Sequence, residues 1–215
     1  MKSCAIFAAN LFLVISVVVL LPVAASAISS PLDGTYEAQF DNVKSNGETV
    51  GCSLVYKNVL IDQRYEQGRP LFLVGNVTLN YRQSKYFLGF KIGVNEIVDG
   101  QSNTLKIKNP YLESRGKTHK PYKVMDAEAA NYQLVAYEAT GALAMLADIF
   151  DNKLGYGFAI GDGTFDLNGL FDFTVKDRGD KEGNIERSQE MINDFTKCAL
   201  GLNDKYMGYL ETKKK

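Results

Sequence analysis

Residues 71–94 read LFLVGNVTLNYRQSKYFLGFKIGV, and this stretch decides the fold class. From residue 86 onward, large apolar side chains occupy every second position: Tyr86, Leu88, Phe90, Ile92 and Val94. A period of two is the side-chain period of a β-strand with one buried face. The segment 86–95 is therefore predicted to be a strand.

The same alternation occurs on both sides of this stretch. Tyr36, Ala38 and Phe40 lie in one such segment, and Cys52, Leu54 and Tyr56 lie in the next. A turn at Asp99-Gly100 precedes a further alternating segment, 105–107. We therefore expect a meander of antiparallel strands from about residue 34 to residue 108.

The second half of the chain adds helices to strands. Residues 109–123 contain two prolines and several basic side chains and are predicted to be an exposed connector, before short strands over 122–125 and 132–136. Apolar residues at spacings of three and four predict a helix over 139–152. Residues 157–160 and 165–175 are predicted to form a hairpin. A closing helix over 185–201 carries one apolar stripe: Ile185, Ser188, Ile192, Phe195 and Ala199.

These elements indicate the α+β class. We expect an antiparallel β-sheet or two-layer β-sandwich, with the two helices covering one face or one open end. Residues 28–202 would form a single β-rich globular domain. Residues 203–215, which end in three lysines, are predicted to be a flexible basic tail.

Residues 1–27 have the composition of a secretory signal peptide. Lys2 precedes an apolar run over 5–23, and Ala25 and Ala27 supply the small side chains that signal peptidase accepts. Cleavage after Ala27 would leave 188 residues. The alternative is an uncleaved membrane anchor, because the run is close to the ~20 residues that span a bilayer. We expect an exported protein, periplasmic or secreted, with no transmembrane segment after cleavage.

The mature chain would keep two cysteines, Cys52 and Cys198, which lie 146 positions apart. An even number of cysteines in an oxidising compartment predicts a disulfide. Cys198 follows Phe195 by three positions, which places its thiol at the edge of the apolar stripe, facing the sheet that carries Cys52. The bridge would link the C-terminal helix to an early strand. The alternative is a pair of buried free thiols.

Composition and motifs exclude several functional classes. The mature chain has 23 basic and 25 acidic residues and no basic patch, so no nucleic-acid partner is expected. Two cysteines and one histidine do not form a zinc site. The oxygen-bearing side chains of the 161–172 segment lack the spacing of an EF-hand loop: Asp162, Asp166, Asn168 and Asp172. No metal and no cofactor is expected.

Catalytic signatures are missing as well. His119 is the only histidine and lies in a basic segment with no acid close in sequence to orient it. No Gly-x-Ser-x-Gly motif supplies a nucleophile. We therefore assign no catalytic residue. A carboxylate-based hydrolase stays open as an alternative, and it requires two carboxylates, or one carboxylate and His119, in one cleft.

The chain contains 12 tyrosines and no tryptophan. Tyr56, Tyr81 and Tyr86 lie on predicted strands and are our candidates for ligand-binding residues, because a tyrosine combines a large ring with a polar tip. The alternative is structural, since tyrosine also favours half-buried sheet surfaces.

The layout is similar to that of small bacterial periplasmic proteins, and it contains no motif that defines a family. We expect a non-catalytic binding or interaction protein of the cell envelope, with an unknown envelope protein as partner. The second hypothesis is a carrier of a small hydrophobic ligand inside a half-open β-barrel, favoured by the many Phe and Tyr residues.

Overall fold

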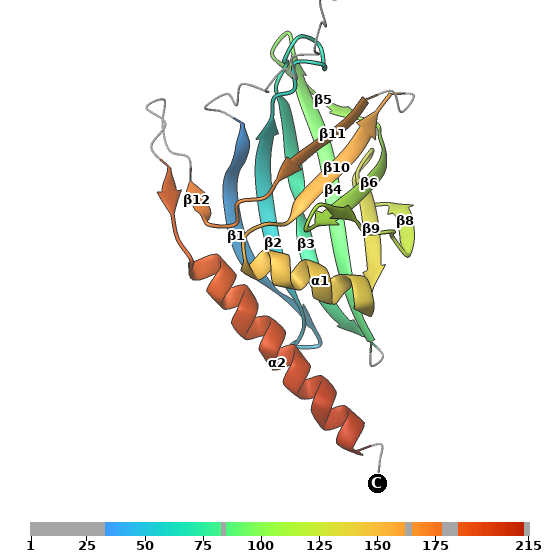
Figure 1. The fold of residues 1–215 in the computed structure, drawn as a ribbon, viewed down its shortest axis with the longest axis vertical. Helices are drawn as coiled ribbons and strands as arrows, with labels where there is room; N and C mark the ends of the chain where they lie inside the picture. Colours follow the sequence, from blue (N-terminus) through green and yellow to red (C-terminus); the bar gives the residue numbers. More distant parts are fainter. Residues whose placement is uncertain (1–32, 83–84, 162–164, 178–184, 213–215) are drawn as a thin grey trace, which may run out of the picture.

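A seven-stranded antiparallel sheet forms the larger layer of the computed structural model, which describes residues 33–82, 85–161, 165–177 and 185–212 (Figure 1). Its strands are β1 (Gly34–Ser45), β2 (Glu48–Leu60), β3 (Leu71–Arg82), β4 (Lys85–Val98), β5 (Gln101–Leu105), β8 (Lys123–Asp126) and β9 (Gln133–Glu138). The strands β2 to β5 each pair antiparallel with the strand before, which confirms the predicted meander. β9 pairs with β4 along the same edge as β5 but at a different part of the strand, and β8 pairs with β9.

A second, four-stranded sheet packs on the inner face of the first. It contains β6 (Ile107–Ser114), β7 (Lys117–Thr118), β10 (Gly155–Ile160) and β11 (Phe165–Leu170). In Figure 1, β10 and β11 run obliquely in front of β2, β3 and β4. The short strands β12 (Val175–Asp177) and β13 (Glu186–Arg187) form a ribbon beside β1. The two sheets make a two-layer arrangement, as predicted.

The space between the sheets is filled by side chains from both layers. Alternate residues of the central strands are buried, as the sequence period predicts: Leu54, Tyr56, Leu71, Leu73, Leu88, Phe90, Ile92 and Val94. Phe171, which follows β11, lies among them, with its ring centroid 4.6 Å from those of Tyr56 and Tyr156. Phe173 stacks on Phe171 at 5.1 Å. Aromatic rings thus occupy the centre of the sandwich.

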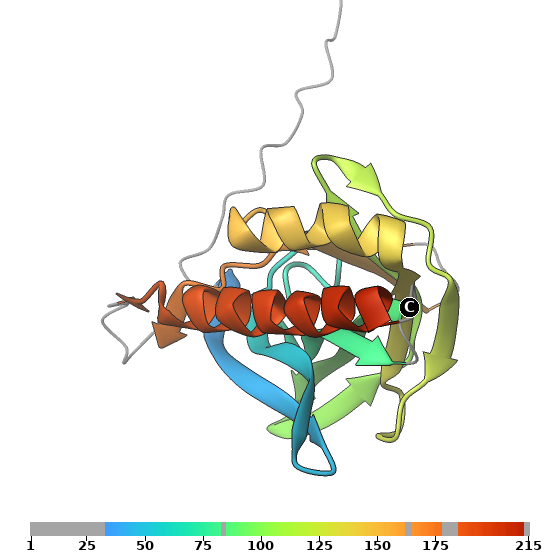
Figure 2. The same cartoon turned by 90° about the horizontal axis from the view of Figure 1, so that it is seen from below.

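Two helices cover one end of the sandwich. Seen from below in Figure 2, α1 (Ala139–Phe150) and α2 (Glu190–Thr212) lie side by side across the strands. α1 buries Ala142, Met145 and Ile149 in the same core to which α2 contributes Ile192 and Phe195. The predicted covering of an open end is confirmed. Within the described residues, neither helix combines the length and the apolar character that a membrane span needs.

The predicted connector over 109–123 is wrong for its first half, because residues 107–114 form strand β6. Gly157 pairs with Tyr111 and Ala159 with Lys108, so a bulge in β6 holds Asn109 and Pro110. A bulged position needs no ladder hydrogen bond from the proline, which has no N–H to donate. The sequence pattern is interrupted there, but the strand is not.

Three further boundaries differ from the prediction. The segment predicted as one strand over 165–175 breaks at Phe171, whose N–H donates to the carbonyl of Leu154 as its ring enters the core. The closing helix begins at Glu190 instead of residue 185, because the Ser188 hydroxyl accepts a hydrogen bond from the Glu190 N–H. It continues to Thr212, where we predicted a frayed tail from residue 203.

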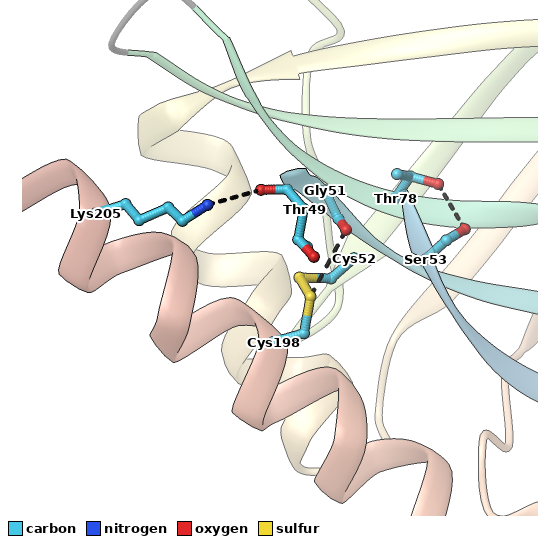
Figure 3. The surroundings of a disulfide bond; sticks show 7 residues. All are labelled: Thr49, Gly51, Cys52, Ser53, Thr78, Cys198 and Lys205. Carbon is cyan, nitrogen blue, oxygen red and sulfur yellow. Dashed lines mark hydrogen bonds between the residues drawn. A yellow bond between two sulfur atoms is a disulfide. The ribbon is translucent and has the colours of Figure 1, made fainter. Parts of the chain in front are cut away.

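A disulfide between Cys52 and Cys198 joins α2 to β2, with a Cα–Cα distance of 5.9 Å. Figure 3 shows it beside the buried hydrogen bond between the hydroxyls of Ser53 and Thr78, at 2.8 Å. Farther along α2, the Lys205 ammonium donates to the carbonyl of Thr49 at 3.4 Å. The predicted bridge is confirmed, and it holds the C-terminal helix on the early strand.

Replacing both cysteines by serine (Cys52→Ser with Cys198→Ser) is expected to lower the free energy of unfolding by about 2–4 kcal/mol, because the bridge closes a long loop in the unfolded chain. Urea unfolding followed by circular dichroism measures the loss. The unsubstituted protein unfolded with a reductant is the control and should show the same loss. A variant as stable as the oxidised protein would contradict this role.

Candidate functional site

The three tyrosines proposed as ligand-binding residues do not share an open surface. Tyr56 is 1% exposed, and its hydroxyl donates to the carbonyl of Lys91 at 2.9 Å. Burial raises the pKa of the Tyr56 phenol well above its ordinary value. Tyr81 and Tyr86 are half-buried and pack on each other with ring centroids 5.3 Å apart. Tyr56 is therefore a core residue, and a ligand role for Tyr81 and Tyr86 stays a prediction.

Several tyrosines instead pack over glycines in the neighbouring strand. A Cβ atom on such a glycine would lie closer than 3.0 Å to tyrosine atoms. Directly opposed pairs are Tyr56 with Gly75, Tyr111 with Gly157 and Tyr156 with Gly169. Tyr132 covers Gly93 in the same way on the outer face of the large sheet. A ring over a glycine restores the packing that the missing side chain leaves open.

Gly75→Ala is expected to lower the free energy of unfolding by about 1–3 kcal/mol, because the added methyl group would collide with the Tyr56 hydroxyl and the carbonyl of Lys91. Gly201→Ala is the matched control. Gly201 lies within α2 with open space around it, so this change should raise stability by up to about 1 kcal/mol. Urea denaturation measures both, and equal effects of the two changes would contradict the ring-over-glycine account.

His119 lines a cavity of about 330 Å³ at the start of α1. Glu138 lines the same cavity, together with Lys120, Tyr122 and Gly141. In the described part of the chain, no hydrogen bond and no ion pair joins His119 to Glu138. The Tyr137 hydroxyl on this wall accepts the N–H of Leu112 at 2.6 Å. His119 and Glu138 therefore share a cleft, as the hydrolase alternative requires, and that alternative stays a prediction.

Asp172, one of the side chains considered for calcium, is surrounded by hydrogen-bond donors. Its carboxylate accepts from the Thr174 hydroxyl at 2.5 Å and from the Asn152 amide at 2.8 Å, and it pairs with Arg187. Burial opposes the charged form, but the bonds from Thr174, Asn152 and Arg187 outweigh it and lower the pKa of Asp172. Asp172 therefore joins the turn after α1 to β13. The described residues contain no group of three or more potential metal ligands.

Asp172→Asn is expected to lower the free energy of unfolding by about 1–3 kcal/mol at neutral pH. Because folding lowers the pKa of Asp172, its stabilisation is present above the ordinary carboxyl pKa of about 4 and is lost as the pH falls through the folded value. The stability gap between the two proteins should therefore shrink in acid. Urea titrations at pH 7 and pH 3 test this, and a gap that does not change with pH would contradict it.

The outer face of the large sheet carries an apolar groove of about 370 Å³. It is lined by Tyr36, Lys57, Asn58, Val59, Pro70, Phe72, Leu73 and Val74. Phe72 and Val74 occupy the outward positions of β3, and Val59 is the pairing partner of Phe72 on β2. An outward sheet face is ordinarily polar, so a hollow with an apolar wall at this place is informative.

The charge at the rim of the apolar groove is already paired. The Lys57 ammonium lies 2.6 Å from the Glu37 carboxylate on the neighbouring strand β1. The side chain of Lys57 therefore presents its carbon stem to the groove while its charge is balanced. Among the residues that the structure describes, no other charged side chain lines the groove. Its electrostatics favour a neutral occupant.

A second groove on the same face, called the polar groove because six of its ten lining residues are polar or charged, has a volume of about 310 Å³. It is lined by Val43, Asn76, Thr78, Asn80, Gly89, Lys91, Asp126, Ala127, Glu128 and Leu134. The segment after β8 that forms one wall is fixed by a hydrogen bond from the Ala127 N–H to the carbonyl of Tyr132, at 2.9 Å. This polar groove adjoins the apolar groove along β3.

Neither groove contains a residue that the sequence analysis proposed as a site residue. One signal in the sequence could have found the apolar groove. Residues 71–74 are four consecutive apolar residues, whereas a strand with one solvated face should be polar at every second position. Phe72 and Val74 are the two that break this rule. No family model, curated protein or solved structure matches this chain.

Proposed function

We propose that this protein is a non-catalytic binding protein of the cell envelope, and that the apolar groove is its site for a small, neutral, apolar ligand. The observation that carries the proposal is the apolar hollow on the sheet face that points to solvent. Its volume of about 370 Å³ lies within the range of small-molecule sites. Burying apolar surface of a ligand there supplies the driving force for binding.

The packing of the sandwich supports a site outside the sheets over one between them. The rings of Tyr56, Tyr156 and Phe171 fill the centre, where a ligand inside a half-open barrel would lie. A carrier of a small hydrophobic ligand remains compatible with the protein when the ligand lies on the outer face. Placing the protein in the periplasm or outside the cell is supported by the disulfide, since such bonds persist in oxidising compartments.

The neutral fluorescent probe N-phenyl-1-naphthylamine is expected to bind the purified protein with enhanced emission. Val74→Asp should weaken binding at least tenfold, because it places a charge in the apolar wall. Val124→Asp on β8 is the control: it makes the same change at an exposed position outside both grooves and should leave binding unchanged. Equal binding by all three proteins, or none by the unsubstituted protein, would contradict the proposal.

A further inference from the structure

The outward side chains of β3 change from apolar to polar along the length of the strand. Alternate residues of a strand point to the same face, and here they are Phe72, Val74, Asn76, Thr78 and Asn80. Phe72 and Val74 belong to the apolar groove, and the other three belong to the polar groove. Consecutive outward positions are about 7 Å apart, so the two grooves meet within the length of a small molecule.

The polar groove offers donors and acceptors that have no partner of their own. In the part of the chain that the structure describes, the side chains of Asn76, Asn80, Asp126 and Glu128 form no hydrogen bond or ion pair with another residue. Amides both donate and accept, while carboxylates accept. A hydroxyl group does both, so a set of neighbouring hydroxyls matches this mixture.

The charges in the polar groove select against an anionic group. Two carboxylates, from Asp126 and Glu128, stand against the single ammonium of Lys91. The Lys91 ammonium also lies 5.9 Å from the centre of the Tyr132 ring, which attracts its charge. A phosphate or carboxylate head would meet net repulsion here. A cationic head would meet net attraction in the same groove, so the choice of a neutral head rests on the unpaired amides of Asn76 and Asn80.

Tyr132 lies on the outer face of the large sheet, beside the two grooves. Its ring covers Gly93, which is the pairing partner of Val74 in the apolar groove, and it adjoins Lys91 in the polar groove. An aromatic face packs well on the C–H groups of a sugar ring, since both surfaces are flat and apolar. Because Tyr132 lines neither groove, no part of the ligand is placed on its ring.

We propose that the ligand is a neutral amphiphile with a polyhydroxylated head, such as a glycoside of an apolar alcohol. The apolar part lies in the apolar groove over Phe72 and Val74, and the sugar lies in the polar groove with its hydroxyls toward Asn76 and Asn80. This inference rests on the proposed function, because the apolar groove holds the tail. It adds the chemical class of the head.

Three probes share one alkyl chain and differ in the head group: octyl β-glucoside, 1-octanol and octylamine. The affinity of each is measured by its displacement of bound N-phenyl-1-naphthylamine. Octyl glucoside should bind at least tenfold more tightly than octanol, the gain from about two net hydrogen bonds. The double change Asn76→Ala with Asn80→Ala should reduce octyl glucoside to the affinity of octanol and leave octanol unchanged. Thermal unfolding of the double variant checks that it is folded.

The outcomes separate the two proposals. Equal affinities of octanol and octyl glucoside would overturn the polyhydroxylated head and leave the apolar site in place. Tighter binding of octylamine than of octyl glucoside would also overturn it, in favour of a cationic head. Failure of every probe to bind, with no fluorescence from the naphthylamine, would overturn the proposed function itself.

Discussion

The packing of Phe171 between the two sheets is the constraint on which the rest of the structure depends. Its ring contacts Tyr56 from the large sheet and Tyr156 from the small one, and Phe173 stacks on it. Interiors of this kind are close-packed, so filling the centre with rings leaves the outer surfaces for recognition. The aromatic content of the chain therefore stabilises the sandwich, and the apolar and polar grooves lie on the outer face of the large sheet.

Much of the fold could be predicted from the sequence because its signals are local. The alternation over 86–95 is a property of one strand, and it became β4. The pairing of Cys52 with Cys198 followed from the even cysteine count and the helical stripe around Phe195. Strand β6 was missed because the bulge at Asn109 and Pro110 interrupts the local pattern, although the pairing partner β10 maintains the strand.

The grooves could not be predicted in the same way, because they depend on the register between strands. For example, Tyr132 covers Gly93 beside Val74. This arrangement follows only when the pairing of β4 with β3 and with β9 is known. The same holds for Tyr56 and Gly75, which are far apart in the sequence and directly opposed in the sheet. A tyrosine that appears available for a ligand in the sequence is thus a core residue once its glycine partner is in place.

The central claim is that ligands bind on the outer face of the large sheet and not between the sheets. The two faces are distinguished by neighbouring residues of β3: the side chain of Leu73 points into the core, and that of Val74 points to the outer face. Methyl NMR spectra recorded during titration with N-phenyl-1-naphthylamine should show large shifts for Val74 and Val59, with contacts from the probe to these methyl groups, while Leu54 and Leu88 stay unchanged. Shifts and probe contacts centred on Leu54 and Leu88 would place the ligand in the core and contradict the account.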